Sequence, residues 1–223
     1  MTEGTKSMAK TKIAGLIFSV LLLLFSAVSA YAIPFSFGNI TNNLAGDAAI
    51  GEAQLSMDVT ANGENILFLF SNSGPADSSI TDIYFDDDVP LLQFSAFVYY
   101  STGGVAYSVG AAPPDLPGGS LSFSADYAYD SDSGNPGVQA NGINPGEQLG
   151  LLFDYCGVGF DQVIAALESG GLNVGIHVQG FESGGSESFT TNSPAPVPEP
   201  ATVLLLGIGL ISLTGIRRKQ LKK

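Results

Sequence analysis

The 223-residue sequence has no lysine or arginine between Ile13 and Ile216. All eight basic side chains lie in the two terminal segments, whereas this interval holds 20 of the 21 carboxylates. Phosphate groups are recognised chiefly by lysine and arginine. The central part of the chain is therefore a poor partner for nucleic acid, nucleotide cofactors and phosphorylated substrates. Its carboxylates must be solvated, hydrogen-bonded to N–H or O–H groups, or bound to external cations.

Cysteine and histidine are also scarce, with one of each, and tryptophan is absent. Cys156 has no partner for an internal disulfide. A thiol nucleophile needs a nearby cation or histidine to lower its pKa, and His177 is the only candidate. A single histidine also makes no zinc site without other ligands. We therefore expect an ordinary exposed histidine and no cysteine catalysis.

Common catalytic motifs are missing as well. The sequence contains no Gly-x-Ser-x-Gly elbow, no His-Glu-x-x-His pair and no phosphate-binding loop. A glycosidase needs only two carboxylates at a set separation, and such a pair cannot be located among the many acidic residues of segment 33–198. The sequence therefore favours a protein that is not an enzyme, with a polysaccharide hydrolase as an open alternative.

The N-terminal segment 1–32 has the pattern of a secretory signal peptide. The basic start consists of Lys6, Lys10 and Lys12. An apolar segment follows over residues 13–26, which is short for a membrane span. Small residues then predict cleavage by signal peptidase after Ala30 or Ala32. An uncleaved signal anchor is the alternative.

The C-terminal segment 197–223 combines a proline-containing motif, an apolar run and a basic end. The motif is Val197, Pro198, Glu199 and Pro200, and the basic end includes Arg217, Arg218 and Lys219. The uncharged run extends over positions 201–216. As a helix it would be about 24 Å long, somewhat short of a hydrocarbon core of about 30 Å. Cations after the run and none before it predict a transmembrane helix with a cytoplasmic C-terminus.

In this order, the three C-terminal pieces resemble the PEP-CTERM sorting signal of Gram-negative bacteria. The resemblance implies that an exosortase, an integral-membrane cysteine protease, cleaves near Pro198–Pro200. It also implies delivery to the cell envelope or the exterior, in an organism that forms biofilm or exopolysaccharide. Segments 79–87, 142–147 and 175–180 are similar to a recurring domain of such proteins, for which the resemblance implies no activity.

The pattern divides the chain into five parts: a signal peptide (1–32), an extracytoplasmic β-domain (33–190), a linker with the motif (191–200), a transmembrane helix (201–216) and a basic tail (217–223). In the β-domain, short apolar segments are broken by Gly, Pro, Asn and Asp. Strands are expected at 54–60, 65–71, 79–86, 91–100, 104–109, 121–129, 149–155, 172–179 and 186–190. Strand 65–71 should be buried on both faces. One short helix is expected at 161–169, with Asp161 as its N-cap.

The many strands and the lack of a βαβ repeat favour a mainly β fold, namely an antiparallel β-sandwich or jelly-roll-like domain. A β-barrel is the second choice. No cofactor is indicated with certainty, but two groups of aspartates are candidate calcium ligands, because calcium prefers several oxygen ligands. They are Asp82, Asp86, Asp87 and Asp88 in one group and Asp126, Asp130 and Asp132 in the other. Segment 130–141 does not match an EF-hand loop. The alternative is a solvated strand edge.

Six tyrosines also offer rings that stack on sugars, although tyrosines in strands often pack in cores. They are Tyr84, Tyr99, Tyr100, Tyr107, Tyr127 and Tyr129. We therefore expect an exported, non-enzymatic surface or matrix protein associated with biofilm or exopolysaccharide. A calcium-dependent carbohydrate-binding module is the alternative, followed by the hydrolase.

Overall fold

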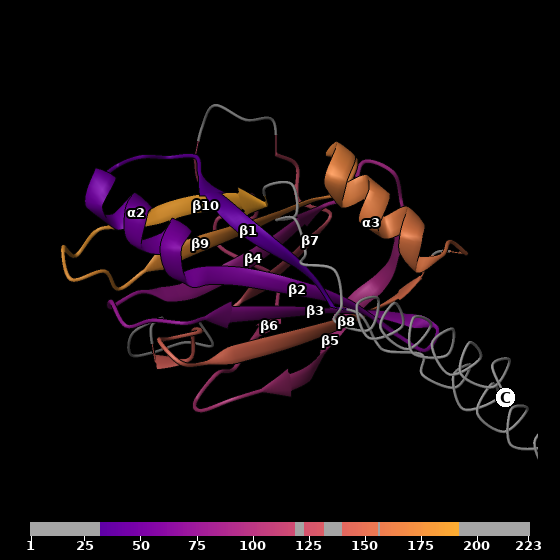
Figure 1. The fold of residues 1–223 in the computed structure, drawn as a ribbon, viewed down its shortest axis with the longest axis horizontal. Helices are drawn as coiled ribbons and strands as arrows, with labels where there is room; N and C mark the ends of the chain where they lie inside the picture. Colours follow the sequence, from indigo (N-terminus) through magenta and orange to yellow (C-terminus); the bar gives the residue numbers. More distant parts are fainter. Residues whose placement is uncertain (1–31, 119–122, 132–139, 156, 192–223) are drawn as a thin grey trace, which may run out of the picture.

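The computed structural model describes residues 32–118, 123–131, 140–155 and 157–191 (Figure 1). The strands are β1 (Ile33–Asn39), β2 (Leu55–Asn62), β3 (Asn65–Asn72), β4 (Ser79–Asp86), β5 (Leu92–Ser101), β6 (Ser108–Val109), β7 (Tyr127–Asp130), β8 (Gln148–Tyr155), β9 (Asn173–Gln179) and β10 (Glu187–Thr191). The helices are α2 (Ala45–Gln54) and α3 (Phe160–Ser169). Neither of these two described helices has the length and apolar character to cross a membrane. The predicted signal peptide, apart from Ala32, and the predicted transmembrane helix lie outside the described residues.

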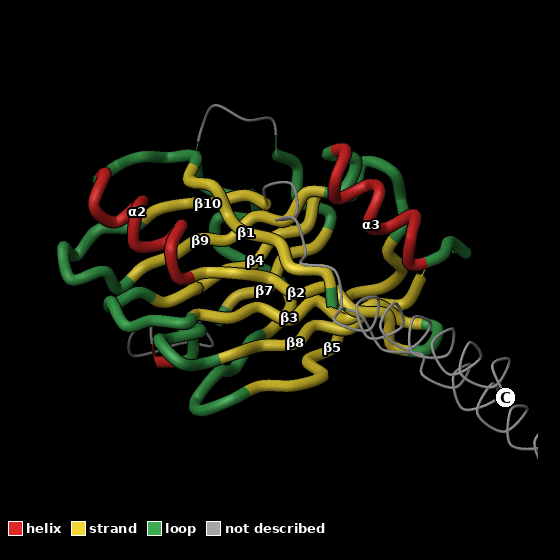
Figure 2. Tube along the Cα trace, viewed as in Figure 1, coloured by secondary structure: helices red, strands yellow, loops and turns green. Residues whose placement is uncertain are grey.

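All the strands belong to one antiparallel sheet in the order β5-β8-β3-β2-β1-β10-β9-β4-β7-β6. The sheet curls, so that its two halves face each other (Figure 2). Strand β1 belongs to both halves, because its first part pairs with β2 and its last part with β10. The prediction of a mainly β, antiparallel domain is confirmed. The two layers of the predicted sandwich are instead the halves of one continuous curled sheet.

The core lies between the two halves of the sheet and is rich in phenylalanine. Phe85 on β4 is completely buried, and its ring lies 4.8 Å from that of Phe153 and 5.1 Å from that of Phe68, both in edge-on contact. Phe153 and Phe68 belong to β8 and β3 in the opposite half of the sheet. Edge-on aromatic pairs add to the burial of apolar area. These contacts therefore hold the two halves of the curled sheet together.

Strand β4 is buried at all eight positions. Its outer face is covered by the loop that follows β6. The Tyr84 hydroxyl donates a 3.1 Å hydrogen bond to the Pro113 carbonyl. Leu116 lies against Gly175 on the neighbouring β9, where an added Cβ would stand 2.6 Å from Leu116 Cδ2. Only glycine admits this close approach.

The prediction that segment 65–71 is buried on both faces is wrong. In β3, buried and half-buried residues alternate along the strand, so that one face is buried and the other is partly exposed. The predicted strands 104–109 and 121–129 are also too long. Strand β6 includes only Ser108–Val109 and β7 only Tyr127–Asp130, and residues 121–122 lie outside the described chain.

Two elements were not predicted, namely β1 and α2. Helix α2 has no side-chain N-cap, so its start carries no sequence signal. The predicted helix 161–169 is present as α3, but it begins at Phe160, with Gly159 rather than Asp161 as N-cap. It ends at Gly170, which has φ +80°. Glycine favours this left-handed C-cap.

The described chain enters and leaves the domain at the same end. Strands β1 and β10 are antiparallel, with Phe37 opposite Thr191. The start of β1 and the end of β10 therefore point the same way, toward the end of the molecule that carries α3. Helix α2 lies at the opposite end (Figure 1). Segments attached before β1 and after β10 thus both begin at the α3 end.

Candidate functional site

A hollow with a volume of about 680 Å³ lies at the α3 end of the described surface. We call it the α3 hollow. Three segments meet there: the β2–β3 turn, the end of β8 and the start of α3. Its apolar lining includes Tyr155, Val158 and Phe160, and its polar lining includes Glu64, Asn65 and Asp154. A volume in this range is typical of small-ligand sites, which lie between about 300 and 1,000 Å³.

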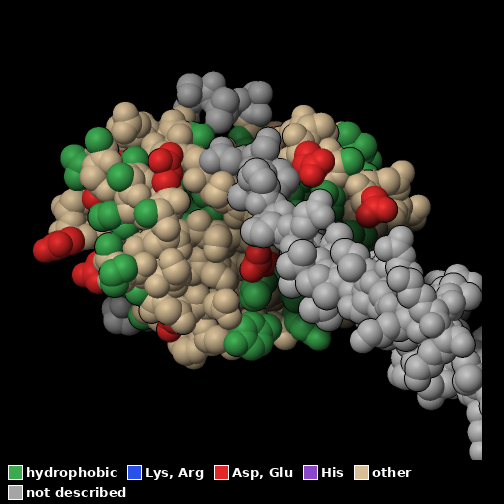
Figure 3. Space-filling model, in the orientation of Figure 1, with side chains coloured by type: hydrophobic (Ala, Val, Ile, Leu, Met, Phe, Trp, Pro, Cys, Tyr) green, Lys and Arg blue, Asp and Glu red, His purple; other side chains and the backbone are tan. Residues whose placement is uncertain are grey.

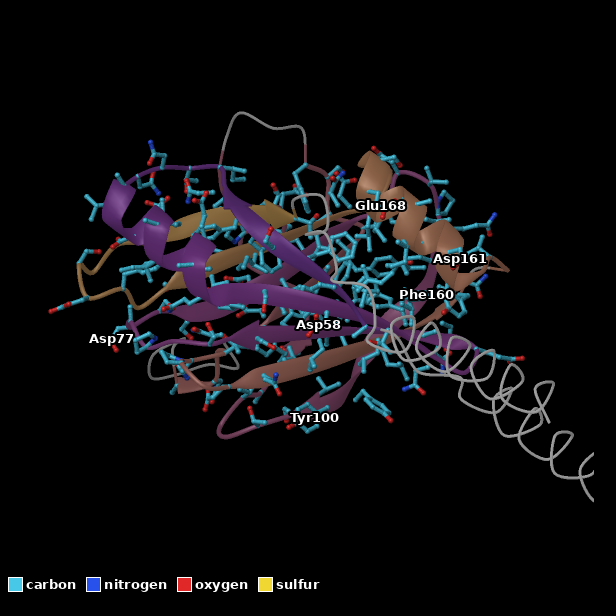
Figure 4. The ribbon with its side chains drawn as sticks, in the orientation of Figure 1. Asp58, Asp77, Tyr100, Phe160, Asp161 and Glu168 are labelled. Atoms are coloured by element: carbon cyan, nitrogen blue, oxygen red, sulfur yellow. The ribbon has the colours of Figure 1, made fainter. Side chains whose placement is uncertain are left out.

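The lining of the α3 hollow is fixed by local contacts. Tyr155, Val158 and Phe160 are half-buried and pack against the hydrophobic core. Asn65 lies opposite Asp154 in the β3–β8 ladder. With the Asn65 amide turned so that its nitrogen faces Asp154, this nitrogen donates a 2.5 Å hydrogen bond to Asp154 Oδ1. Phe160 is the first residue of α3, beside the exposed Asp161 (Figure 4). The aromatic and acidic groups therefore stand on rigid strand and helix ends.

Burial raises the pKa of the Tyr155 hydroxyl, and the negative charge of Asp161 raises it further. The phenol therefore stays protonated and able to donate a hydrogen bond at neutral pH. Acidic side chains are also spread over the visible face of the molecule, on which no described residue is basic (Figure 3). The hollow thus combines aromatic rings with negative charge.

The predicted calcium ligands do not form one group. Asp82 lies opposite Asp130 in the β4–β7 ladder, whereas Asp86 is the last residue of β4. The length of extended strand between them places Asp82 and Asp86 about 13 Å apart along β4. Asp132 lies outside the described residues. The structure therefore separates an Asp82–Asp130 pair from a second set around Asp86.

The second set consists of Asp86, Asp87, Asp88 and Asp126. Asp87 Oδ2 accepts 2.9 Å hydrogen bonds from the N–H groups of Leu91 and Leu92, and Asp126 Oδ2 accepts a 2.8 Å bond from the Asp87 N–H. Asp87 Oδ1 is buried and has no hydrogen-bond partner. Burial raises the pKa of both Asp86 and Asp87, and neighbouring carboxylates add to this effect.

Within the described ranges, no group of three or more His, Cys, Asp or Glu side chains is arranged to hold a metal ion. Asp88 and Asp126 are exposed, whereas Asp86 and Asp87 are buried, so the four carboxylates do not converge from one open loop. Calcium binding stays a prediction.

His177 is half-buried, so the prediction of an exposed histidine is wrong. It lies on β9 between Ser188 on β10 and Asp82 on β4 in the strand registers. Its Nδ1 atom is 3.1 Å from Ser188 Oγ, and burial lowers its pKa. Ser188 is completely buried. This row of Ser, His and Asp therefore presents no accessible nucleophile. Cys156 lies outside the described residues.

Most of the tyrosines predicted to stack on sugars belong to the interior. Tyr84 and Tyr129 are buried, and the hydroxyls of the half-buried Tyr107 and Tyr127 donate to backbone carbonyls. Only Tyr99 and Tyr100 are exposed, with fractions of 53% and 45%. Both lie on the edge strand β5, where Figure 4 labels Tyr100.

The aromatic residues of the α3 hollow, Tyr155 and Phe160, were not among the predicted sites. Each belongs to a segment that reads as an ordinary strand end or helix start. The sequence around Tyr155 and Phe160 offers one local signal for such a site. It is an aromatic residue at the end of a strand, followed by glycines and a helix. The proximity of Tyr155 and Phe160 depends on the fold.

A mainly β, acidic domain followed by a proline-containing motif, an apolar run and a basic end defines an exported protein with a C-terminal sorting segment. Residues 196–219 match the PEP-CTERM protein-sorting motif. The chain therefore carries a C-terminal PEP-CTERM sorting motif, and the predicted resemblance of this segment is confirmed. The motif implies that an exosortase sorts the protein through the membrane for export. No curated protein and no solved structure gave a significant match.

The predicted sorting residues all lie within the matched segment and outside the described structure. They are Val197, Pro198, Glu199, Pro200, Arg217, Arg218 and Lys219. The match begins after the last described strand and does not include the β-domain.

Proposed function

We propose that this protein is a non-enzymatic component of the cell surface or extracellular matrix, associated with exopolysaccharide. Signal peptidase would remove residues 1–32, and an exosortase would process the chain near Pro198–Pro200. The sorting motif carries this proposal, because it directs the β-domain out of the cytoplasm.

The arrangement of the chain ends supports the proposal. Both ends of the described domain lie at the α3 end, so a membrane segment attached there leaves the α2 end pointing away from the membrane. The carboxylates of segment 33–198 give the released domain a strongly negative surface without basic side chains. Such a surface stays hydrated and takes up counter-ions, as a matrix component requires.

Fractionation of cells that express the tagged chain tests this function. The wild-type protein should lack residues 1–32 and appear in the envelope or the medium. The Glu199→Ala variant should accumulate in the inner membrane, and Glu182→Ala, an exposed change within the β-domain, should behave like the wild type. A cytosolic protein with an intact N-terminus would overturn the proposal. Release of sugar products from extracted exopolysaccharide by the purified protein would overturn its non-enzymatic part.

A calcium-dependent role at the end of β4 is the second candidate. The buried, unpartnered Oδ1 atom of Asp87 favours it, because a cation would satisfy that oxygen. The neighbouring exposed carboxylates of Asp88 and Asp126 would supply further oxygen ligands. Thermal melts test this role, since calcium should raise the melting temperature and EDTA should reverse the change.

A further inference from the structure

We propose that the α3 hollow binds a hexose ring that carries a positively charged amino group, as in glucosamine residues of a polysaccharide. The inference deepens the proposed function, since it names the chemistry of the matrix partner. It depends on the walls of the hollow and on the charges of the chain.

The apolar lining of the hollow matches one face of a sugar ring. Tyr155 and Phe160 keep part of their rings accessible while the rest packs on the core. Pyranose rings present a face of C–H groups, and flat aromatic side chains provide a rigid apolar surface for it. The same rings attract an ammonium group through their negative faces. Because both residues are held by the core, little ordering is needed on binding.

The polar lining selects for positive charge. Glu64 and Asp154 belong to the hollow, and Asp161 acts on Tyr155 from the start of α3. No lysine or arginine exists between Ile13 and Ile216 to neutralise these carboxylates from within the domain. An ammonium group of a ligand would therefore meet uncompensated negative charge. Uronic acids and sugar phosphates would be repelled.

The hydrogen bonds already present orient the carboxylates for this task. In the orientation that lets it donate, the Asn65 amide occupies Asp154 Oδ1 and leaves Oδ2 available to a ligand. At the start of α3, the Gly159 N–H donates a 3.1 Å hydrogen bond to Gln162 Oε1. This bond occupies one of the helix N-terminal donors that would otherwise attract an anion. The carboxylates of the hollow can accept hydrogen bonds from hydroxyl and ammonium groups of a ligand.

Calorimetry with the mature exported protein and three tetrasaccharides tests the proposal. The three are tetramers of glucosamine, of N-acetylglucosamine and of galacturonate. We expect binding of the glucosamine tetramer, much weaker binding of the N-acetylated form and none of galacturonate. Asp154→Asn keeps the shape of the side chain and removes its charge, and should weaken binding about fivefold. Phe160→Leu should weaken it as well, through loss of the ring face.

Asp77→Asn is the matched control, because Asp77 is an exposed carboxylate far from the α3 end (Figure 4). A polycationic sugar attracts any acidic protein to some degree, so this variant should retain the wild-type affinity. Equal losses in Asp154→Asn and Asp77→Asn would mean general charge attraction and would overturn the proposal. Equal affinity for the glucosamine and N-acetylated tetramers would also overturn it. Circular dichroism of each variant checks that the fold is intact, and export is measured separately by fractionation.

Discussion

Glu187 Oε1 accepts a 2.5 Å hydrogen bond from the backbone N–H of Leu44, the residue immediately before helix α2. The Glu187 side chain is completely buried on β10. Its other oxygen accepts from the Thr41 hydroxyl, the Asn39 side-chain amide and the Asn43 N–H. A domain without lysine or arginine thus satisfies a buried charge with hydrogen-bond donors at a helix start.

Replacement of this carboxylate should weaken the domain. Glu187→Gln removes the charge and turns an amide N–H₂ group toward donors, so we expect a loss of about 2–3 kcal/mol in the free energy of unfolding. Urea denaturation measures it. Glu182→Gln, at an exposed position in the preceding loop, should change the stability very little. Similar stabilities for the two variants would show that the Glu187 hydrogen bonds contribute nothing net.

The buried carboxylate of Asp87 should make the domain less stable as the pH rises. Burial raises the pKa of Asp87 above its ordinary value of 3.8, so the fold favours the protonated form. The contribution of protonated Asp87 to the free energy of unfolding is complete below pH 3.8. It is lost as the pH rises through the folded-state pKa. Asp87→Asn should remove this loss. Its stability relative to the wild type should therefore increase from pH 3.8 upward, as measured by urea denaturation at several pH values. A pH-independent difference between the two proteins would contradict the prediction.

His177 should have the opposite pH dependence. Burial lowers its pKa below the ordinary value of 6.5, so the fold favours the neutral ring. The contribution of the neutral His177 ring to the free energy of unfolding is complete above pH 6.5. It is lost as the pH falls through the folded-state pKa. His177→Gln, which retains a polar partner for Ser188, should remove this part of the pH dependence. Thermal melts below and above pH 6.5 measure it, and parallel curves for the two proteins would argue against the prediction.

Added salt should stabilise the domain, because its carboxylates repel one another without internal cations. Melting temperatures should rise from low to moderate ionic strength. If calcium binds at the end of β4, it should raise the melting temperature more than sodium chloride at the same ionic strength, and EDTA should reverse the difference. Asp126→Asn should reduce the extra effect. If calcium and sodium chloride raise the melting temperature equally at the same ionic strength, charge screening explains the whole effect and the calcium site is excluded.

Two glycines of helix α2 should respond in opposite ways to replacement by alanine. An added Cβ at Gly51 would overlap the ring of Phe189, so Gly51→Ala should destabilise the domain by about 1–3 kcal/mol. At Gly46 nothing lies within 4 Å, and Gly46→Ala should stabilise it by about 0.4–1 kcal/mol. Urea denaturation of both variants provides the comparison. A stabilising Gly51→Ala would show that Phe189 moves away at no cost.

Much of the fold follows from local patterns. Short apolar segments bounded by Gly, Pro, Asn and Asp predicted β2, β4, β5, β8, β9 and β10 within a few residues. Helix α3 was also found, since its apolar stripe and the glycines after it are local signals. Strand β1 and helix α2 were missed. Helix α2 is stabilised by packing on Phe189 and by the Glu187 hydrogen bonds at its start, and both partners belong to β10, the last described strand.

The predicted calcium ligands show the limit of composition. Asp82 and Asp86 are close in the sequence, yet an extended strand separates them. Asp87 and Asp126 are far apart in the sequence, yet a hydrogen bond joins them. Strand pairing decides such distances, and the spacing of acidic residues along the chain does not.

By itself, the sequence determined the export route, the mainly β character and the negative charge of the domain. These depend on the order of residues, the lengths of apolar runs and the count of charges, which folding does not alter. The tertiary structure alone decided that one curled sheet forms both layers. It also decided which carboxylates are buried and which three segments meet in the α3 hollow. These features depend on contacts between residues far apart in the chain, because antiparallel pairing and curling of the sheet bring them together.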